Sequence, residues 1–272
     1  MDYKFYRIEK DKSTGWIYLN RAEKKNAMNP PAFYELPQII SEMDKDTSIR
    51  VIVIASSGDT FSAGIDLTEM SMEIEEIRNP DQKGDTKWSL IKKIYRLQDM
   101  VNCLQATDKP VIAAVNGLCI GAGLDLISGC DIRLCSEDAK FSLREAAVGF
   151  VADIGVLQRL PPIIGEGNTR ELAFTAKFID AKTALRMHLV NAVFENKDSL
   201  MKGALDMALE IASVSPLAVK ATKRVLNFLN EERIKRGLEY VASVSADIIP
   251  SEDLYEAINA FIEKRKPDFK GR

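Results

Sequence analysis

The chain has 272 residues, of which 46% are hydrophobic and 28% are charged, a composition typical of a globular protein with a sizeable core. Its formal charge of −3 provides no broad basic surface, so the sequence does not suggest bulk affinity for nucleic acid. No apolar run approaches the roughly 20 residues that span a bilayer, and the N-terminal segment resembles neither a signal peptide nor a transit peptide. We therefore expect a cytoplasmic protein that binds neither nucleic acid nor a membrane.

Predicted strands and helices alternate through about residue 195. The run at residues 50–56 ("RVIVIAS") is continuous and β-branched, as in a strand of a sheet that is covered on both faces. Helices are expected from about residue 32, just after two prolines, and around residues 88–106. The other strands are expected at residues 6–10, 15–20, 109–117, 131–136, 139–143 and 190–194. This alternation predicts an α/β core.

The segment 71–87 is charged and contains Pro and Gly, which predicts a solvated insertion.

No strand is expected from residue 198 onward. Three amphipathic helices follow the last strand, and their apolar stripes must be covered by something, so we expect an oligomer; they lie at residues 199–215, 216–230 and 251–266. We divide the chain into a core with the active site (1–197) and a C-terminal helical oligomerisation region (198–272).

Cysteine and histidine usage suggests no metal centre. The four cysteines lie in apolar surroundings without CxxC spacing, so we expect reduced side chains in the core; they are Cys103, Cys119, Cys130 and Cys135. The single histidine, His188, leaves no metal cluster and no Ser-His or Cys-His catalytic pair.

Glycine-containing loops follow two of the expected strands, at residues 61–70 ("FSAGIDLTEM") and 116–126 ("NGLCIGAGLDL"). Each precedes an expected helix, whose first backbone N–H groups are unpaired, and glycine allows a ligand to approach the backbone closely. Two such loops can aim two N–H groups at one carbonyl oxygen, as an oxyanion hole requires. Ordinary strand-to-helix turns contain the same residue types, so that alternative stays open. Neither loop matches the dinucleotide-binding GxGxxG or the P-loop pattern.

Three acidic residues stand in stretches that otherwise predict burial. Asp125 lies in the second glycine loop, and Glu145 and Asp153 lie eight residues apart in "REAAVGFVADIG". Each has a structural explanation: a carboxylate at a helix N-terminus, an ion pair with Arg144, and an N-cap, respectively. Together they are candidates for proton transfer, because the residues around Asp153 are otherwise uncharged from 146 to 157.

The sequence resembles the enoyl-CoA hydratase/isomerase (crotonase) superfamily in five segments, "RAEKKNAMN", "FSAGIDLTEM", "NGLCIGAGLDLISGCDIRL", "ADIGVLQRLPPIIG" and "FIEKRKPDFKGR". The stretch "DLISGCDIRLCSEDAKFSLREAAVGFVADIGVLQRLP" is most similar to the Δ3,5-Δ2,4-dienoyl-CoA isomerases within it. The resemblance implies a spiral of ββα units whose C-terminal helices build trimers, commonly paired into hexamers (dimers of trimers).

The resemblance also implies a catalytic site. The backbone N–H groups of Ile65 and Ala122 would hold the thioester oxygen of an acyl-CoA; many relatives have glycine at the second position. Asp125 and Glu145 match two glutamates of the hydratases that stand twenty positions apart, and the first is one methylene shorter here, as in the dienoyl isomerases. Asp153 matches an aspartate of the dienoyl isomerases that simple hydratases generally lack. The implied reaction removes a proton from C2, a role that we assign to Glu145, and returns a proton at C6, a role that we assign to Asp153; the reverse assignment stays open.

The implied substrate is an acyl-CoA thioester of fatty-acid metabolism, with CoA as part of the substrate and no further cofactor or metal. Further binding residues carried over from the motifs are Lys25, Ala63, Gly64, Asp66, Gly121 and Lys264. Lys264 would meet the CoA phosphates from a neighbouring subunit, although a solvated basic helix end would have the same composition. A 2-enoyl-CoA hydratase, or another acyl-CoA enzyme of the same fold, is the alternative activity. The alternatives to an enzyme are an RNA-binding protein and a catalytically inactive scaffold. The net negative charge counts against RNA binding, and the presence of all three acids counts against an inactive scaffold.

Overall fold

The structure is a computed structural model that describes residues 3–73 and 86–272. Its strands span Tyr6–Asp11 (β1), Thr14–Leu19 (β2), Val51–Ser56 (β3), Val111–Val115 (β4), Leu118–Ile120 (β5), Ile132–Ser136 (β6), Lys140–Ser142 (β7), Ile179–Asp180 (β8) and Ala192–Phe194 (β9). The main sheet has the order β1-β2-β3-β4-β6-β9, with β1 antiparallel to β2 and the later pairs parallel. A smaller sheet has the order β5-β7-β8.

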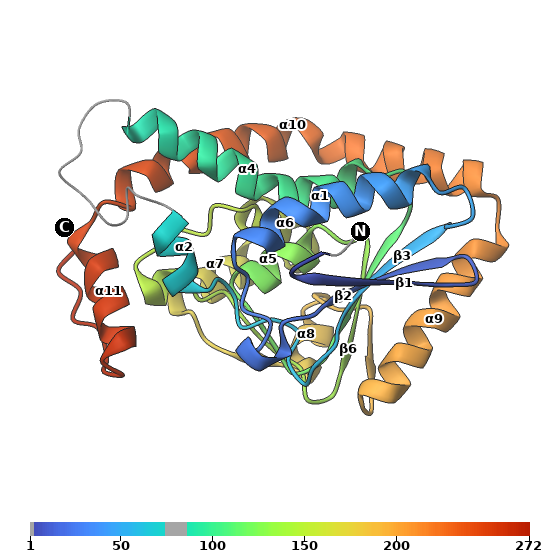
Figure 1. Ribbon diagram of the computed structural model, residues 1–272, viewed down its shortest axis with the longest axis horizontal. Helices are drawn as coiled ribbons and strands as arrows, with labels where there is room; N and C mark the ends of the chain where they lie inside the picture. The colour runs from blue at the N-terminus through green and yellow to red at the C-terminus, as the bar shows by residue number, and fades with distance from the viewer. Residues whose placement is uncertain (1–2, 74–85) are drawn as a thin grey trace.

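Helices flank the main sheet (Figure 1). They span Pro30–Lys45 (α1), Leu67–Glu73 (α2), Thr86–Ala106 (α4), Ala122–Ser128 (α5), Val156–Ile164 (α6), Glu166–Thr175 (α7), Ala181–Arg186 (α8), Lys197–Ser213 (α9), Pro216–Ile248 (α10) and Glu252–Ile262 (α11). The predicted α/β class is confirmed. In the part of the chain that the structure describes, no helix is both long and apolar enough to cross a membrane.

All six residues of β3 are buried, because helices cover both faces of the sheet. Ile52 and Ile54 point into a large cluster that includes residues of α1, α4 and α5. Val51 and Val53 point the other way, into a cluster completed by the small side chains of α9. Because side chains alternate along a strand, β3 contributes to a hydrophobic core on each face of the sheet, as the continuous β-branched run predicts.

The expected strands are all present, but two short ones are additional. β5 and β8 have three and two residues, too few to show a period-2 pattern in the sequence. The charged segment predicted as an insertion, 71–87, lies mostly outside the described residues. The four cysteines are free, three of them buried and Cys103 partly buried.

The C-terminal helices differ from the prediction in length and in what they cover. α9 packs on the sheet through Leu200, Ala204 and Ala208. α10 continues for 18 residues beyond its predicted end at residue 230. Its apolar spacing resumes after a charged run, and its inner face lies along α4 and α6. Figure 1 shows α10 and α4 running side by side, with α11 at the far end of the molecule. The division at residue 197 stays a prediction.

Candidate active site

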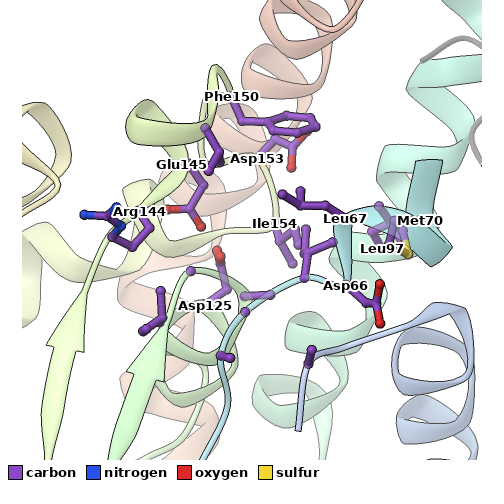
Figure 2. Close-up of a pocket in the computed structure, with 18 of the residues that line it drawn as sticks. Asp66, Leu67, Met70, Leu97, Asp125, Arg144, Glu145, Phe150, Asp153 and Ile154 are labelled. Carbon is purple, nitrogen blue, oxygen red and sulfur yellow. The ribbon is translucent and has the colours of Figure 1, made fainter. Parts of the chain in front are cut away.

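A cavity of about 590 Å³ opens where the two glycine loops meet the segment 144–154. Its polar lining comes from the N-terminal part of the chain and from the three acids. One wall is apolar and is formed largely by helices α2, α4 and α11 and by the loop that precedes α6. Figure 2 shows part of it, with Leu67, Met70, Leu97, Phe150 and Ile154 labelled. The full set of wall residues is Leu67, Met70, Ile94, Leu97, Phe150, Val151, Ile154, Ile249, Ile258 and Phe261.

The two glycine loops are bonded to each other. Ser62 and Cys119 form an isolated parallel bridge. Around it, the N–H of Ser62 donates to the carbonyl of Leu118 at 2.8 Å, and the N–H of Ile120 donates to the carbonyl of Ser62 at 3.0 Å. Two segments that are far apart in the sequence are thereby held as one unit at the edge of the cavity.

Glycine is required where these loops touch. Gly64 and Gly121 have φ of 90° and 52°, in the left-handed region that favours glycine. A Cβ on Gly121 would lie 3.1 Å from Oε1 of Glu145, and a Cβ on Gly64 would lie 3.1 Å from the carbonyl oxygen of Ile120. The close approach of backbone, backbone and carboxylate thus depends on the missing side chains.

Each loop presents one backbone N–H to the cavity. Met28 forms a parallel bridge with Ile65, in which Met28 donates to the carbonyl of Gly64 at 2.7 Å and accepts from the N–H of Asp66 at 2.9 Å. Because Met28 bonds the groups on either side, the N–H of Ile65 points away from it. Ala122 is the first residue of α5, whose N–H has no partner within the helix. In the described residues neither N–H has an acceptor, and both residues line the cavity.

Asp125 is the most deeply buried of the three acids, with 1% of its surface exposed. Its Oδ1 accepts a hydrogen bond from the N–H of Val156 at 2.7 Å, while Oδ2 is buried without a partner among the described residues. Burial, and then the charge of Glu145, raise the pKa of Asp125 well above its usual range. Both causes favour the protonated form of Asp125.

Glu145 begins a short 3₁₀ turn, Glu145–Val148, and points into the cavity. Figure 2 shows its carboxyl group facing that of Asp125. Burial raises the pKa of Glu145 to about 7, with a further increase from the charge of Asp153. Its Oε2 is buried and has no partner in the part of the chain that the structure describes. Glu145 is therefore poised to gain or lose a proton near neutral pH.

Asp153 lies in the loop before α6, on the side of Phe150 (Figure 2). Its Oδ2 accepts a hydrogen bond from the hydroxyl of Ser245 on α10, and its backbone carbonyl accepts one from Nε2 of Gln98 at 2.8 Å. Burial raises the pKa of Asp153 to about 6, and the bond from Ser245 lowers it. Asp153 is not the N-cap of α6, since Gly155 occupies that position.

The other predicted binding residues divide into three groups. Ala63, Gly64 and Gly121 line the cavity, as does Lys25. Asp66 also lines it, but its carboxylate is bonded to Arg21 at 2.8 Å. Lys264, in contrast, is exposed in the turn just after α11 and does not line the cavity.

Several residues of the site carry no sequence motif. These residues are Ser245 and Gln98, which reach Asp153 from α10 and α4. Their roles depend on how the helices pack, so no spacing in the sequence indicates them. In the described residues, no group of three or more His, Cys, Asp or Glu side chains is placed to hold a metal ion.

Comparison with known proteins gives consistent matches. A family model described as enoyl-CoA hydratase/isomerase matches residues 9–272. The chain is 41% identical over 271 residues to the mitochondrial Delta(3,5)-Delta(2,4)-dienoyl-CoA isomerase of Dictyostelium discoideum, covering 99% of this chain and 92% of that one. It is 40% identical over 263 residues to the peroxisomal protein of that name from Arabidopsis thaliana, covering 97% and 95%. The crystal structure of an enoyl-CoA hydratase/isomerase from Pseudoalteromonas atlantica T6c superposes with a TM-score of 0.85 at 28% identity, covering 98% of this chain and 100% of that one.

Proposed function

The chain belongs to the enoyl-CoA hydratase/isomerase family, and on this basis we propose that it is an isomerase that converts 3,5-dienoyl-CoA into 2,4-dienoyl-CoA. The observation that carries the proposal is the joint presence of Glu145 and Asp153 in the cavity that the two unpaired N–H groups border. Two relatives that match nearly the whole chain bear the name of this activity.

The two N–H groups account for the first part of the reaction. The thioester oxygen accepts hydrogen bonds from Ile65 and Ala122, which stabilise the charge that develops there when C2 loses a proton. Each pre-aimed donor of this kind contributes about 3–4 kcal/mol to the transition state. The resulting dienolate spreads its charge from the oxygen to C6, so a proton can return at that distant carbon.

The positions of the acids support a division of roles between them. Glu145 lies beside Gly121, the residue before the second N–H donor, and is therefore at the thioester end of the site. Asp153 lies against α10, away from that contact. Glu145 takes the C2 proton, the double bonds shift from C3=C4 and C5=C6 to C2=C3 and C4=C5, and Asp153 gives its proton to C6. Asp125 stays protonated and orients the cluster.

The two acids hold one proton between them near neutral pH. Their pKa values are about 7 for Glu145 and about 6 for Asp153, so close that either acid can hold that proton. The reaction needs the proton on Asp153, and the positions of the two acids therefore decide their roles. After turnover, Glu145 carries the proton and Asp153 is ionised, and transfer of one proton restores the starting state.

The apolar wall supports a fatty-acyl chain as the substrate's tail, since its side chains are aliphatic apart from two phenylalanines. At the other end, Lys25 lines the cavity and would meet the phosphates of CoA, and Lys264 would do so from a neighbouring subunit. We propose that CoA enters as part of the substrate and that no further cofactor takes part.

The outer face of α10 supports an oligomer. Several of its large apolar side chains are exposed, more than a soluble monomer ordinarily leaves on one helix; they are Leu217, Val225, Leu226, Phe228, Leu229 and Tyr240. We propose a homotrimer, or a hexamer made of two trimers. The compartment stays a prediction: composition favours the cytoplasm, whereas the two relatives are named mitochondrial and peroxisomal.

The rival activity is hydration of a 2-enoyl-CoA by Asp125 and Glu145. It is less well supported, because Asp125 is held neutral and bonded to Val156, and because it gives Asp153 no task. Ultraviolet absorbance separates the two. With 3,5-dienoyl-CoA, the band of the conjugated 2,4-dienoyl thioester should grow. No growth, together with loss of the absorbance of a 2-enoyl-CoA, would make the protein a hydratase.

A further inference from the structure

Ser245 places a hydroxyl group on an otherwise apolar face of α10. It lies on the inner side of α10, among Leu238, Val241, Ala242 and Ala246, and none of its surface is exposed. Burying a hydroxyl without a hydrogen bond costs free energy, so its partner matters. That partner is Oδ2 of Asp153, 92 residues earlier in the chain, at 2.5 Å.

A second contact from a neighbouring helix holds the backbone of the same residue. Gln98 on α4 is 2% exposed, and its Nε2 donates to the carbonyl of Asp153 at 2.8 Å and to the carbonyl of Leu238 on α10 at 3.2 Å. The loop before α6 is therefore tied to both long helices. Gln98 fixes where the residue sits, and Ser245 fixes how its carboxyl group is turned.

The bond from Ser245 distinguishes the two carboxyl oxygens. An ionised carboxylate only accepts hydrogen bonds, so the hydroxyl donates to Oδ2. When Asp153 is protonated on Oδ1, Oδ2 is still an acceptor, and the bond survives the proton transfer. Oδ1 is then the oxygen left to carry the proton that goes to the acyl chain.

We propose that Ser245 is a positioning residue for the second proton transfer, acting by holding Oδ2 of Asp153 so that Oδ1 delivers the proton to C6. In that step the Oδ1–H bond breaks and the C6–H bond forms, and the electron pair of the dienolate supplies the new bond. This inference rests on the proposed isomerase function and adds a residue to it.

The test compares two reactions of one variant in D₂O. Removal of the C2 proton depends on Glu145 and the two N–H donors, so exchange of C2–H with solvent should remain within about threefold of wild type in Ser245→Ala. Conversion to the 2,4-diene should fall about ten- to a hundredfold, the usual effect of losing a hydrogen bond to a charged group. A general loss of structure would lower both rates together.

Three further variants make the test decisive. Ser243→Ala, a partly buried serine on the same helix, should leave both rates unchanged. Ser245→Thr restores a hydroxyl and should recover most of the isomerisation. Ser245→Cys keeps the size of the side chain but provides only a weak hydrogen-bond donor, so it should retain C2 exchange and lose conversion. It therefore tests the hydrogen bond even if the cavity left by alanine unfolds the helix.

The outcomes also separate this inference from the function on which it rests. A wild-type protein that does not isomerise 3,5-dienoyl-CoA would overturn both. Wild-type isomerisation together with unchanged conversion in both Ser245→Ala and Ser245→Cys would overturn the role of Ser245 alone. Equal loss of exchange and conversion in Ser245→Cys would also overturn it, because the residue would then only support the fold.

Discussion

The carboxyl group of Asp125 accepts a hydrogen bond from the backbone N–H of Val156 at 2.7 Å, which joins the first turn of α5 to the first residue of α6. Asp125, which the sequence predicts as a catalytic residue, thus also holds the start of a neighbouring helix. Burial raises the pKa of Asp125 and so favours its neutral form, in which it adds no second negative charge beside Glu145.

Replacing Asp125 should separate its hydrogen bond from its acidity. Asp125→Asn keeps an oxygen for Val156 and is neutral, so we expect turnover within about tenfold of wild type. Asp125→Ala leaves the buried N–H of Val156 without a partner and should lower the free energy of unfolding by about 1–3 kcal/mol. Urea unfolding and turnover measured on both variants check this. Equal loss of activity in the two would show that the acid itself takes part in the reaction.

Adding a methyl group at Gly121 should damage the site more than the fold. In Gly121→Ala the new Cβ would lie 3.1 Å from Oε1 of Glu145, which displaces the acid next to the oxyanion donor. We expect kcat to fall by about a hundredfold or more, the effect of losing one such donor, as measured by steady-state kinetics.

Gly165→Ala is the matched control for this change. Gly165 also has a positive φ, 84°, but a Cβ there would meet nothing within 4 Å. Both variants therefore carry backbone strain of about 1–3 kcal/mol, and only Gly121→Ala carries the clash. A similar loss of kcat in both would mean that strain, not the approach to Glu145, limits the site.

The pKa values of the acid pair predict the pH dependence of activity and of stability. Activity needs one proton on the pair, so it should be highest between about pH 6 and 7 and fall on both sides. Both pKa values are raised in the folded protein, so the acids favour folding below about pH 4, and that contribution is lost as the pH rises through 6 and 7. Glu145→Gln should therefore raise the free energy of unfolding at pH 8 by on the order of 1–3 kcal/mol and change it little at pH 4. Urea titrations at the two pH values measure this, and a stabilisation that is equal at both would contradict it.

The exposed apolar face of α10 should control assembly. Leu229 is 73% exposed in the single chain, and Leu229→Glu would place a charge in the proposed contact. We expect a smaller particle by light scattering at the same concentration. Lys235→Glu places the same carboxylate side chain at an exposed position of the same helix, with an even larger change of charge, and should leave the assembly intact. An unchanged mass in Leu229→Glu would place the contact elsewhere.

The sequence predicts the layered core well and its periphery less well. The strand at β3 is evident because its apolar residues are continuous, and the glycine loops are evident because positive φ at Gly64 and Gly121 demands glycine. The end of α10 is not evident, since the charged run after residue 230 imitates a helix end although Ile234 and Leu238 continue the buried face.

The same limit applies within the site. The acids are visible in the sequence because charge is rare among buried residues. That Asp125 is bonded to Val156, and that Ser245 is bonded to Asp153, follows only from how α5, α6 and α10 pack. The sequence does not indicate which residue a single serine in an amphipathic helix contacts, so it does not predict the role of Ser245.

The most direct test of the two-acid relay locates deuterium after reaction in D₂O with 3,5-dienoyl-CoA. Wild type should place deuterium at C6 of the 2,4-diene. Asp153→Asn should exchange the C2 proton without forming the conjugated diene, and Glu145→Gln should do neither, because removal of the C2 proton comes first. The relay would be contradicted if Asp153→Asn formed the diene at the rate of wild type. The two roles would be reversed if Glu145→Gln retained C2 exchange and Asp153→Asn lost it.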